Sequence, residues 1–135
     1  MERHAIQDPL TESVIGAFYD VYNALGFGFL ECHYTKALAL ELLERGHEVG
    51  REVYFPVMYK GHLLGRHRLD MLVDKTLIVE AKATVELAKA DTYQVHNYLR
   101  ATNLRVALLL HFGPEAKVHR FTPRARAPKN HPLIP

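Results

Sequence analysis

Three ionisable side chains interrupt two apolar runs that a short polar turn joins near the middle of the chain, LDMLVDKTLIVEAKA at residues 69–83. They are Asp70, Glu80 and Lys82. Side chains alternate between the two faces of a strand, so all three share one face if the stretch forms a hairpin. A three-residue loop at 74–76 would place Asp70 directly opposite Glu80, with Cβ atoms about 5 Å apart. The other face would carry only apolar side chains and pack on a core: Leu69, Met71, Val73, Leu77, Val79, Ala81 and Ala83.

This arrangement indicates metal-assisted chemistry on a phosphate. Two carboxylates that face each other across a strand pair repel, unless a cation lies between them. Oxygen ligands suit a hard ion, and Mg²⁺ needs only one or two carboxylates plus water and substrate phosphate. We therefore expect Mg²⁺ as the cofactor, for which Mn²⁺ can substitute. Lys82 would orient or activate a water, or stabilise charge that develops on the phosphate.

Two other interpretations of the hairpin stay open. Charged side chains on a strand commonly form a solvated face, and a surface salt-bridge network could join Arg68, Asp70, Glu80 and Lys82. A two-residue turn would also shift the register and place Leu69 opposite Glu80.

The flanking sequence predicts the elements that position these residues. Asp8, or alternatively Thr11, caps a first helix of apolar residues at helical spacing. Three helices are expected at about residues 9–25, 30–45 and 88–101. Strands are expected at 48–61, 62–73, 76–83 and 104–113, with or without a last strand at 116–121. Pro56 indicates an edge strand or a bulge. The nearly continuous apolar strand at 104–113 should be buried on both faces.

The resulting order, ααβββαβ with or without a last β, predicts an α/β fold with a mixed sheet. Its sheet should contain antiparallel hairpins and one parallel crossover. One domain is expected over residues 1–122, followed by a Pro/Arg-rich tail at 123–135 that is predicted to be disordered. Cys32 is the only cysteine, so no internal disulfide can form, which favours a cytoplasmic location. No segment reaches the ~20 apolar residues of a membrane span. The net charge of +2 neither indicates nor excludes nucleic-acid binding.

Three separated motifs resemble a known nuclease family. Asp70, nine intervening residues and Glu80-Ala81-Lys82 resemble the D-x(n)-E-x-K signature of the PD-(D/E)XK nuclease superfamily. GFLECHY at 28–34 fits the G-x-x-E-x-x-Y pattern of the GxxExxY protein family. QVHNYLRATNLRVALLLHFG at 94–113 resembles the Q-x-x-x-Y-L helix and the following strand of that family. The resemblance covers about residues 10–121, with one small departure at His111, where the family commonly has asparagine.

The resemblance implies a restriction-endonuclease-like three-layer core, with a mixed β-sheet flanked by helices. It also implies a Mg²⁺-dependent phosphodiesterase site and a nucleic-acid substrate, DNA or RNA. Asp70, Glu80 and the backbone carbonyl of Ala81 would then ligate the metal, and Lys82 would position or deprotonate the attacking water.

Three further residues are candidates for supporting roles. By the resemblance, Glu31 would reach the metal directly or through water. The alternative is a carboxylate that simply favours the positive end of a helix. Gln94 and Tyr98 are four residues apart and share a helix face, where they could orient water or substrate. Tyr98 could equally be a packing residue with a polar tip, and Tyr34 is expected in the core or behind the site.

Two other functions stay open at this point. The chain could be a catalytically silent nucleic-acid-binding or assembly module that acts as a homodimer or with a partner protein. Less favoured is a protein–protein adaptor that uses the charged face. Arg66, His67 and Arg68 near the proposed site are better candidates for phosphate contacts than Arg120 and the basic residues of the tail, Arg124, Arg126 and Lys129.

Overall fold

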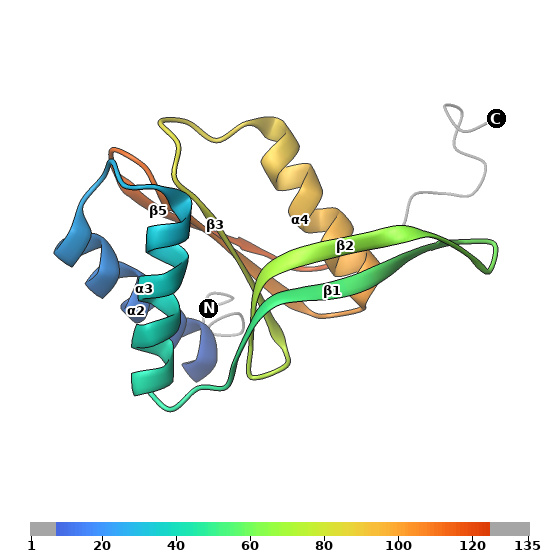
Figure 1. Ribbon diagram of the computed structural model, residues 1–135, viewed down its shortest axis with the longest axis horizontal. Coiled ribbons are helices and arrows are strands. Elements are labelled where there is room, and N and C mark those ends of the chain that lie inside the picture. The colour runs from blue at the N-terminus through green and yellow to red at the C-terminus, as the bar shows by residue number, and fades with distance from the viewer. Residues whose placement is uncertain (1–7, 125–135) are drawn as a thin grey trace, which may run out of the picture.

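A mixed five-stranded sheet forms the centre of the protein, in the computed structural model that describes residues 8–124. Helices α2 and α3 cover one face of the sheet and α4 covers the other (Figure 1). In chain order the elements are α2 (Pro9–Leu25), α3 (Glu31–Glu44), β1 (Val49–Tyr59), β2 (His62–Val73), β3 (Leu77–Lys82), α4 (Lys89–Thr102), β4 (Val106–Phe112) and β5 (Ala116–Phe121). The predicted three-layer α/β architecture is confirmed, with the last strand present. The predicted tail at 123–135, with Arg126 and Lys129, lies almost entirely outside the described residues.

The sheet has the order β1-β2-β3-β4-β5. Its neighbours pair antiparallel, except that β3 and β4 run parallel and are joined by the α4 crossover. Strand β4, which lies between β3 and β5, is buried on both faces, as its apolar run predicts. Leu108 and Leu110 pack against α2 and α3, whereas Ala107 and Leu109 belong to the core under α4. Strand β4 is therefore packed between two hydrophobic cores, and its pairing with β3 fixes the position of β3.

The turn between β2 and β3 sets the register of the charged residues. Val73 pairs with Leu77 and Met71 pairs with Val79, so residues 74–76 form a three-residue loop. The next position on each strand is occupied by Asp70 and Glu80, where the regular pairing has ended and the two residues are joined by side chain–backbone hydrogen bonds. The alternative two-residue turn is wrong.

The face assignment of Leu69 needs a correction. Leu69 was expected to share a core with Met71, but it packs in the α4 core, while Met71 packs against α2 and α3. Between them β2 stops pairing with β3 and follows β1 away from the sheet. Glu52, on β1 between the partners of these two residues, has a left-handed backbone with φ 54°. This local irregularity accompanies the change of face.

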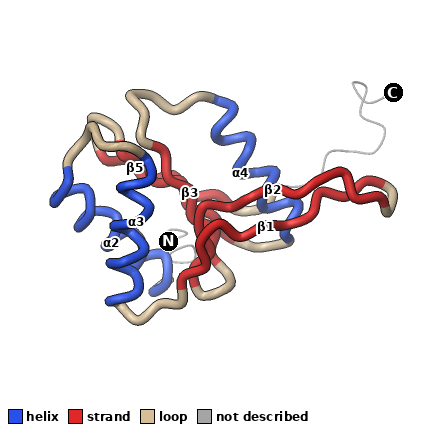
Figure 2. The backbone as a smooth tube through the Cα atoms, viewed as in Figure 1, coloured by secondary structure: helices blue, strands red, loops and turns tan. Residues whose placement is uncertain are grey.

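Strands β1 and β2 continue beyond the sheet as a two-stranded arm, residues 53–68, which Figure 2 shows projecting from the body. Pro56 lies on the edge strand β1, which is one of its two predicted settings, and a register irregularity follows between Val57 and Met58. At the tip, Lys60 and Gly61 both have positive φ, as tight hairpin turns require. The arm is mostly exposed, so packing against the core contributes little to it.

Three polar side chains fasten α2 to the turn between β2 and β3. Ser13 Oγ lies 2.7 Å from His47 Nε2, and His47 Nδ1 lies 2.8 Å from Asp74 Oδ2. Asp74 Oδ1 also accepts a hydrogen bond of 2.8 Å from the Glu48 N–H. The groups are ordered as in a serine hydrolase. However, Ser13 lies within the second turn of α2, where the backbone N–H groups are bonded along the helix and are not free to stabilise an oxyanion. These contacts are therefore structural.

Replacement of Asp74 by asparagine should lower the free energy of unfolding by about 1 kcal/mol at neutral pH. Asparagine tolerates the left-handed backbone at this position but carries no charge. The hydrogen bond from Glu48 N–H, followed by that from His47, lowers the pKa of Asp74. The stabilisation is thus present above the unfolded-state pKa and is lost as pH falls through the lower folded-state pKa. Urea unfolding should show a difference between wild type and variant that shrinks in acid. The exposed Glu48→Gln is the matched control and should change little.

No helix within residues 8–124 is both long and apolar enough to cross a bilayer.

Candidate functional site

The carboxylates of Asp70 and Glu80 bridge β2 and β3 at the point where these two strands separate. The Asp70 N–H donates to Glu80 Oε2 at 2.9 Å, and the Ala81 N–H donates to Asp70 Oδ2 at 3.1 Å. The regular ladder ends one pair earlier, so these N–H groups would otherwise lack a partner across the strands. The side chains replace the missing backbone carbonyls. The divergence of two strands therefore fixes two carboxylates side by side.

Burial and repulsion make the ionised form of Glu80 costly. The residue is only 4% exposed. Burial raises the pKa of Glu80 to about 8, and the Asp70 charge acts in the same direction. The hydrogen bond from the Asp70 N–H and the Lys82 ammonium oppose this shift without cancelling it. The pair therefore carries an excess of negative potential, which a cation would relieve.

Glu31 faces the same cleft as Asp70. The cleft lies between the start of α3 and strands β1 and β2, has a volume of about 320 Å³ and is also lined by Arg51 and Arg68. Burial, followed by the Asp70 charge, raises the pKa of Glu31, while Lys82 lowers it. A carboxylate stabilised mainly by the helix dipole would have a lowered pKa. The influence of Asp70 and Lys82 on this pKa shows that Glu31 lies close enough to interact with both of these residues.

The G-x-x-E-x-x-Y residues have a clear structural basis. Gly28 has φ 121°, which side chains rarely allow, so the loop before α3 depends on glycine. The buried Tyr34 ring stacks on Phe112, and its hydroxyl donates to the Gly26 carbonyl and accepts from the Phe29 N–H. Tyr34 thus braces the loop that leads into Glu31, in agreement with its predicted place in the core.

Lys82 extends from the end of β3 toward α4. Its Nζ lies 3.6 Å from Asp91 Oδ1, which was not among the predicted site residues. Asp91 also accepts a hydrogen bond of 3.0 Å from the Ala88 N–H at the start of α4. Within residues 8–124 no ion pair links Asp70 or Glu80 to a cation, so the predicted surface salt-bridge network is not formed. Asp91 could have been recognised by its spacing, one and two turns before Gln94 and Tyr98 on the same helix face.

Tyr98 is buried on α4 and approaches both the arm and the acids. Its ring makes T-shaped contacts with His67 and Phe55, with ring centroids 4.9 Å and 5.6 Å apart, respectively. Burial raises its pKa, followed by the charges of Glu80 and Asp70, so the phenol stays protonated and can donate a hydrogen bond. Gln94 lies half-buried one turn earlier on the same side of α4.

The donor set fits a hydrated hard cation rather than a preformed metal cage. In the described part of the chain, no three His, Cys, Asp or Glu side chains come close enough together to hold a metal ion. Mg²⁺ does not require this, because one or two carboxylates suffice with water and substrate oxygens. Asp70 and Glu80 each use one oxygen for a backbone N–H and keep the other. The carbonyl of Ala81 is the nearest backbone oxygen donor by sequence.

Comparison with known proteins identifies a family but adds little on function. A family model described as the PD-(D/E)XK nuclease superfamily matches residues 8–121, within the predicted domain at 1–122. A solved structure titled "Crystal structure of SSO0001" is 16% identical, and the match covers 93% of this chain and 74% of that chain with a TM-score of 0.49. Such a distant likeness carries no functional argument. No curated protein matches the sequence.

Proposed function

Because the chain belongs to the PD-(D/E)XK nuclease superfamily, we propose that it is a Mg²⁺-dependent nuclease that hydrolyses phosphodiester bonds in DNA or RNA. The observation that carries this proposal is the reciprocal bracing of Asp70 and Glu80 beside Lys82, with Glu80 buried and its pKa raised. A structural carboxylate pair in a sheet would be unfavourable without a cation. The unfavourable placement of these two carboxylates is explained if the site binds a cation.

The residues divide the work as follows. Asp70, Glu80 and the Ala81 carbonyl would hold the metal. When bound, a divalent ion stabilises charge on the scissile phosphate and makes water a better nucleophile. Lys82, whose ammonium lies 3.6 Å from Asp91 Oδ1, positions the attacking water or takes its proton.

The remaining site residues act on substrate and solvent. Glu31 accepts a hydrogen bond from water in the cleft that it shares with Asp70. The protonated phenol of Tyr98 and the amide of Gln94 orient the substrate phosphate or a water. Attack on phosphorus occurs in line with the leaving oxygen.

Gly28, Glu31 and Tyr34 support a finer assignment to the GxxExxY family. The glycine allows the loop conformation, the tyrosine braces it and the glutamate reaches the cleft. Together, these three residues support a loop conformation in which the Glu31 carboxylate lines the same cleft as Asp70.

A cleavage assay tests the proposed activity. Single- and double-stranded DNA and RNA should be compared with Mg²⁺, with Mn²⁺ and with chelator. We expect cleavage of at least one substrate that requires the metal and is abolished by chelator. Absence of cleavage from all four substrates with either metal would reject the enzymatic proposal.

Nucleic-acid binding without turnover is the second candidate, and the arm favours it specifically. No Asp or Glu occurs between Val53 and Leu69, whereas Lys60, Arg66 and Arg68 do. A two-stranded ribbon fits a nucleic-acid groove, and its cations would contact phosphates. A silent binder would show affinity that responds to salt but not to divalent metal or to Asp70→Asn.

A further inference from the structure

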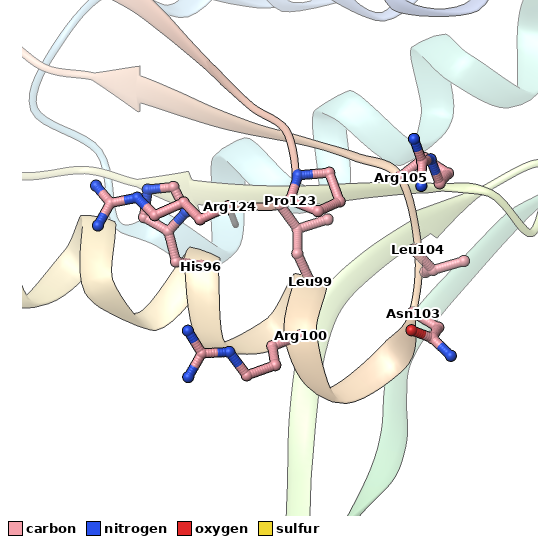
Figure 3. A pocket seen from close by; sticks show the side chains of 8 residues that line it. All are labelled: His96, Leu99, Arg100, Asn103, Leu104, Arg105, Pro123 and Arg124. Carbon is pink, nitrogen blue, oxygen red and sulfur yellow. The ribbon is translucent and has the colours of Figure 1, made fainter. Parts of the chain in front are cut away.

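A second polar pocket lies beside α4, formed with the segments that precede β4 and follow β5. Figure 3 shows its lining, in which the Arg100 and Arg124 side chains extend to the same side as His96, while Arg105 lies across the pocket. The remaining lining residues are Leu99, Asn103, Leu104 and Pro123. Its volume is about 160 Å³, which leaves room for a small anion with ordered water, since one water occupies about 30 Å³.

Among the described residues, no carboxylate pairs with the arginines of this pocket. Within residues 8–124, Arg100, Arg105 and Arg124 form no ion pair, whereas the arginines at 45, 68 and 120 each pair with a carboxylate. Three guanidinium groups that line one pocket without a carboxylate between them repel one another. A bound anion would remove that repulsion.

His96 provides an independent observation that points to a ligand. Its Nδ1 is buried and has no hydrogen-bond partner in the described structure. The ring is held by an edge contact with Phe121, with centroids 5.0 Å apart. Burial lowers the pKa of His96, and the charges of Arg124 and Arg100 act in the same direction. A buried ring nitrogen without a partner calls for an explanation, and an anion bound beside Arg100 and Arg124 would supply one if the neutral ring carries its proton on Nδ1.

The sequence reinforces this local picture. Residues 92–135 carry seven Lys and Arg but only one acid, Glu115. Residues 1–91 carry ten Lys and Arg but fourteen acids. The small net charge of the whole chain therefore hides a strongly basic C-terminal third, and the pocket lies within it.

We propose that the pocket formed by His96, Arg100, Arg105 and Arg124 is a phosphate-binding site separate from the acidic cleft. Planar guanidinium groups match phosphate oxygens in pairs, and His96 adds a ring nitrogen. The phosphate belongs to a nucleic-acid strand or is free in solution, and the chemistry of recognition is the same.

The position of Arg100 links this pocket to the nuclease site. Arg100 also lines the cavity between α4 and the arm, together with Tyr98 and His67. The charges of Glu80 and Asp70 in turn raise the pKa of Tyr98. A strand bound at the acids could thus follow the arm and α4 to place a second phosphate in the pocket. This part of the inference rests on the proposed function, whereas the binding of phosphate does not.

Titration with inorganic phosphate, followed by the NMR signals of the His96 ring, tests the pocket directly. We expect saturable shifts at roughly millimolar phosphate that equal ionic strength of sodium chloride does not reproduce. The double variant Arg100→Gln/Arg124→Gln should weaken this response at least tenfold. Both residues are exposed, so the fold should persist, which circular dichroism can verify. Lys117→Gln is the matched control, because this basic residue of the same third is paired with Glu115 outside the pocket.

Binding of a fluorescent oligonucleotide separates the two sources of phosphate. If the double variant loses both the phosphate response and oligonucleotide affinity, the pocket holds a phosphate of the strand. If only the phosphate response is lost, the pocket holds free phosphate. A response that chloride reproduces, or that the double variant retains, would overturn the site. None of these readouts uses cleavage, so their failure is distinct from failure of the nuclease proposal.

Discussion

Replacement of Asp70 by asparagine should abolish metal-dependent cleavage and leave the fold intact. Asp70 Oδ2 accepts a hydrogen bond from the Ala81 N–H, and the amide oxygen of asparagine can accept the same bond. The substitution therefore keeps the contact between β2 and β3 but removes the charge that would bind the cation. Loss of one preorganised electrostatic group typically costs on the order of 10²–10³-fold in rate, and loss of the cation itself should cost more.

The measurement is kcat/KM on the best substrate from the cleavage assay, with circular dichroism as a check of the fold. Lys82→Met should show a comparable loss, because it keeps the apolar part of the side chain and removes the ammonium. Glu48→Gln changes an exposed carboxylate near the opposite end of the hairpin and should retain activity. Wild-type rates in purified Asp70→Asn protein would show that the activity belongs to another site or to a contaminant.

The hairpin that carries this prediction could be read from the sequence because its determinants are local. Strand alternation assigns Asp70 and Glu80 to one face, and the length of the loop at 74–76 makes them opposite each other. Apolar periodicity and helix caps likewise placed the helices and strands close to their observed bounds. These features depend on residues a few positions apart, so pattern alone can reveal them.

The features that the sequence did not reveal depend on contacts between distant segments. Beyond Met71, β2 continues to pair with β1 but no longer with β3, and Leu69 lies in the α4 core. The same separation creates the unpaired N–H groups that Asp70 and Glu80 satisfy. Asp91 was missed because a carboxylate in the first turn of a helix is common; its spacing places it on the helix face of Gln94 and Tyr98, but its contact with Lys82 arises from the fold.

Replacement of Glu80 by glutamine should stabilise the protein when no divalent cation is present. Glutamine can still accept the hydrogen bond from the Asp70 N–H but places no charge in this buried position. Above about pH 8, where Glu80 is ionised in the wild type, we expect the free energy of unfolding to rise by on the order of 3 kcal/mol. The exposed Glu86→Gln removes the same formal charge on the loop after β3 and should change little.

The pH dependence gives this prediction its sign. Because the pKa of Glu80 is raised to about 8 from its usual value of 4.5, the folded state holds a proton that the unfolded state has released. The stabilisation is complete below the unfolded-state pKa and is lost as pH rises through the folded-state pKa. Metal-free wild type should therefore lose stability between about pH 4.5 and pH 8, and this loss should be absent in Glu80→Gln.

A divalent cation should reverse the loss, since it replaces the proton between the carboxylates. At about pH 8, Mg²⁺ or Mn²⁺ should raise the Tm of the wild type and leave the Tm of Glu80→Gln and Asp70→Asn nearly unchanged. Differential scanning fluorimetry with and without chelator measures this without any substrate. A Glu80→Gln protein that is less stable than wild type above pH 8, or that keeps the full metal shift, would mean that Glu80 is held by structural contacts and not poised for a cation. The acids would then be a brace between two strands, and the proposed nuclease site would lose its physical basis.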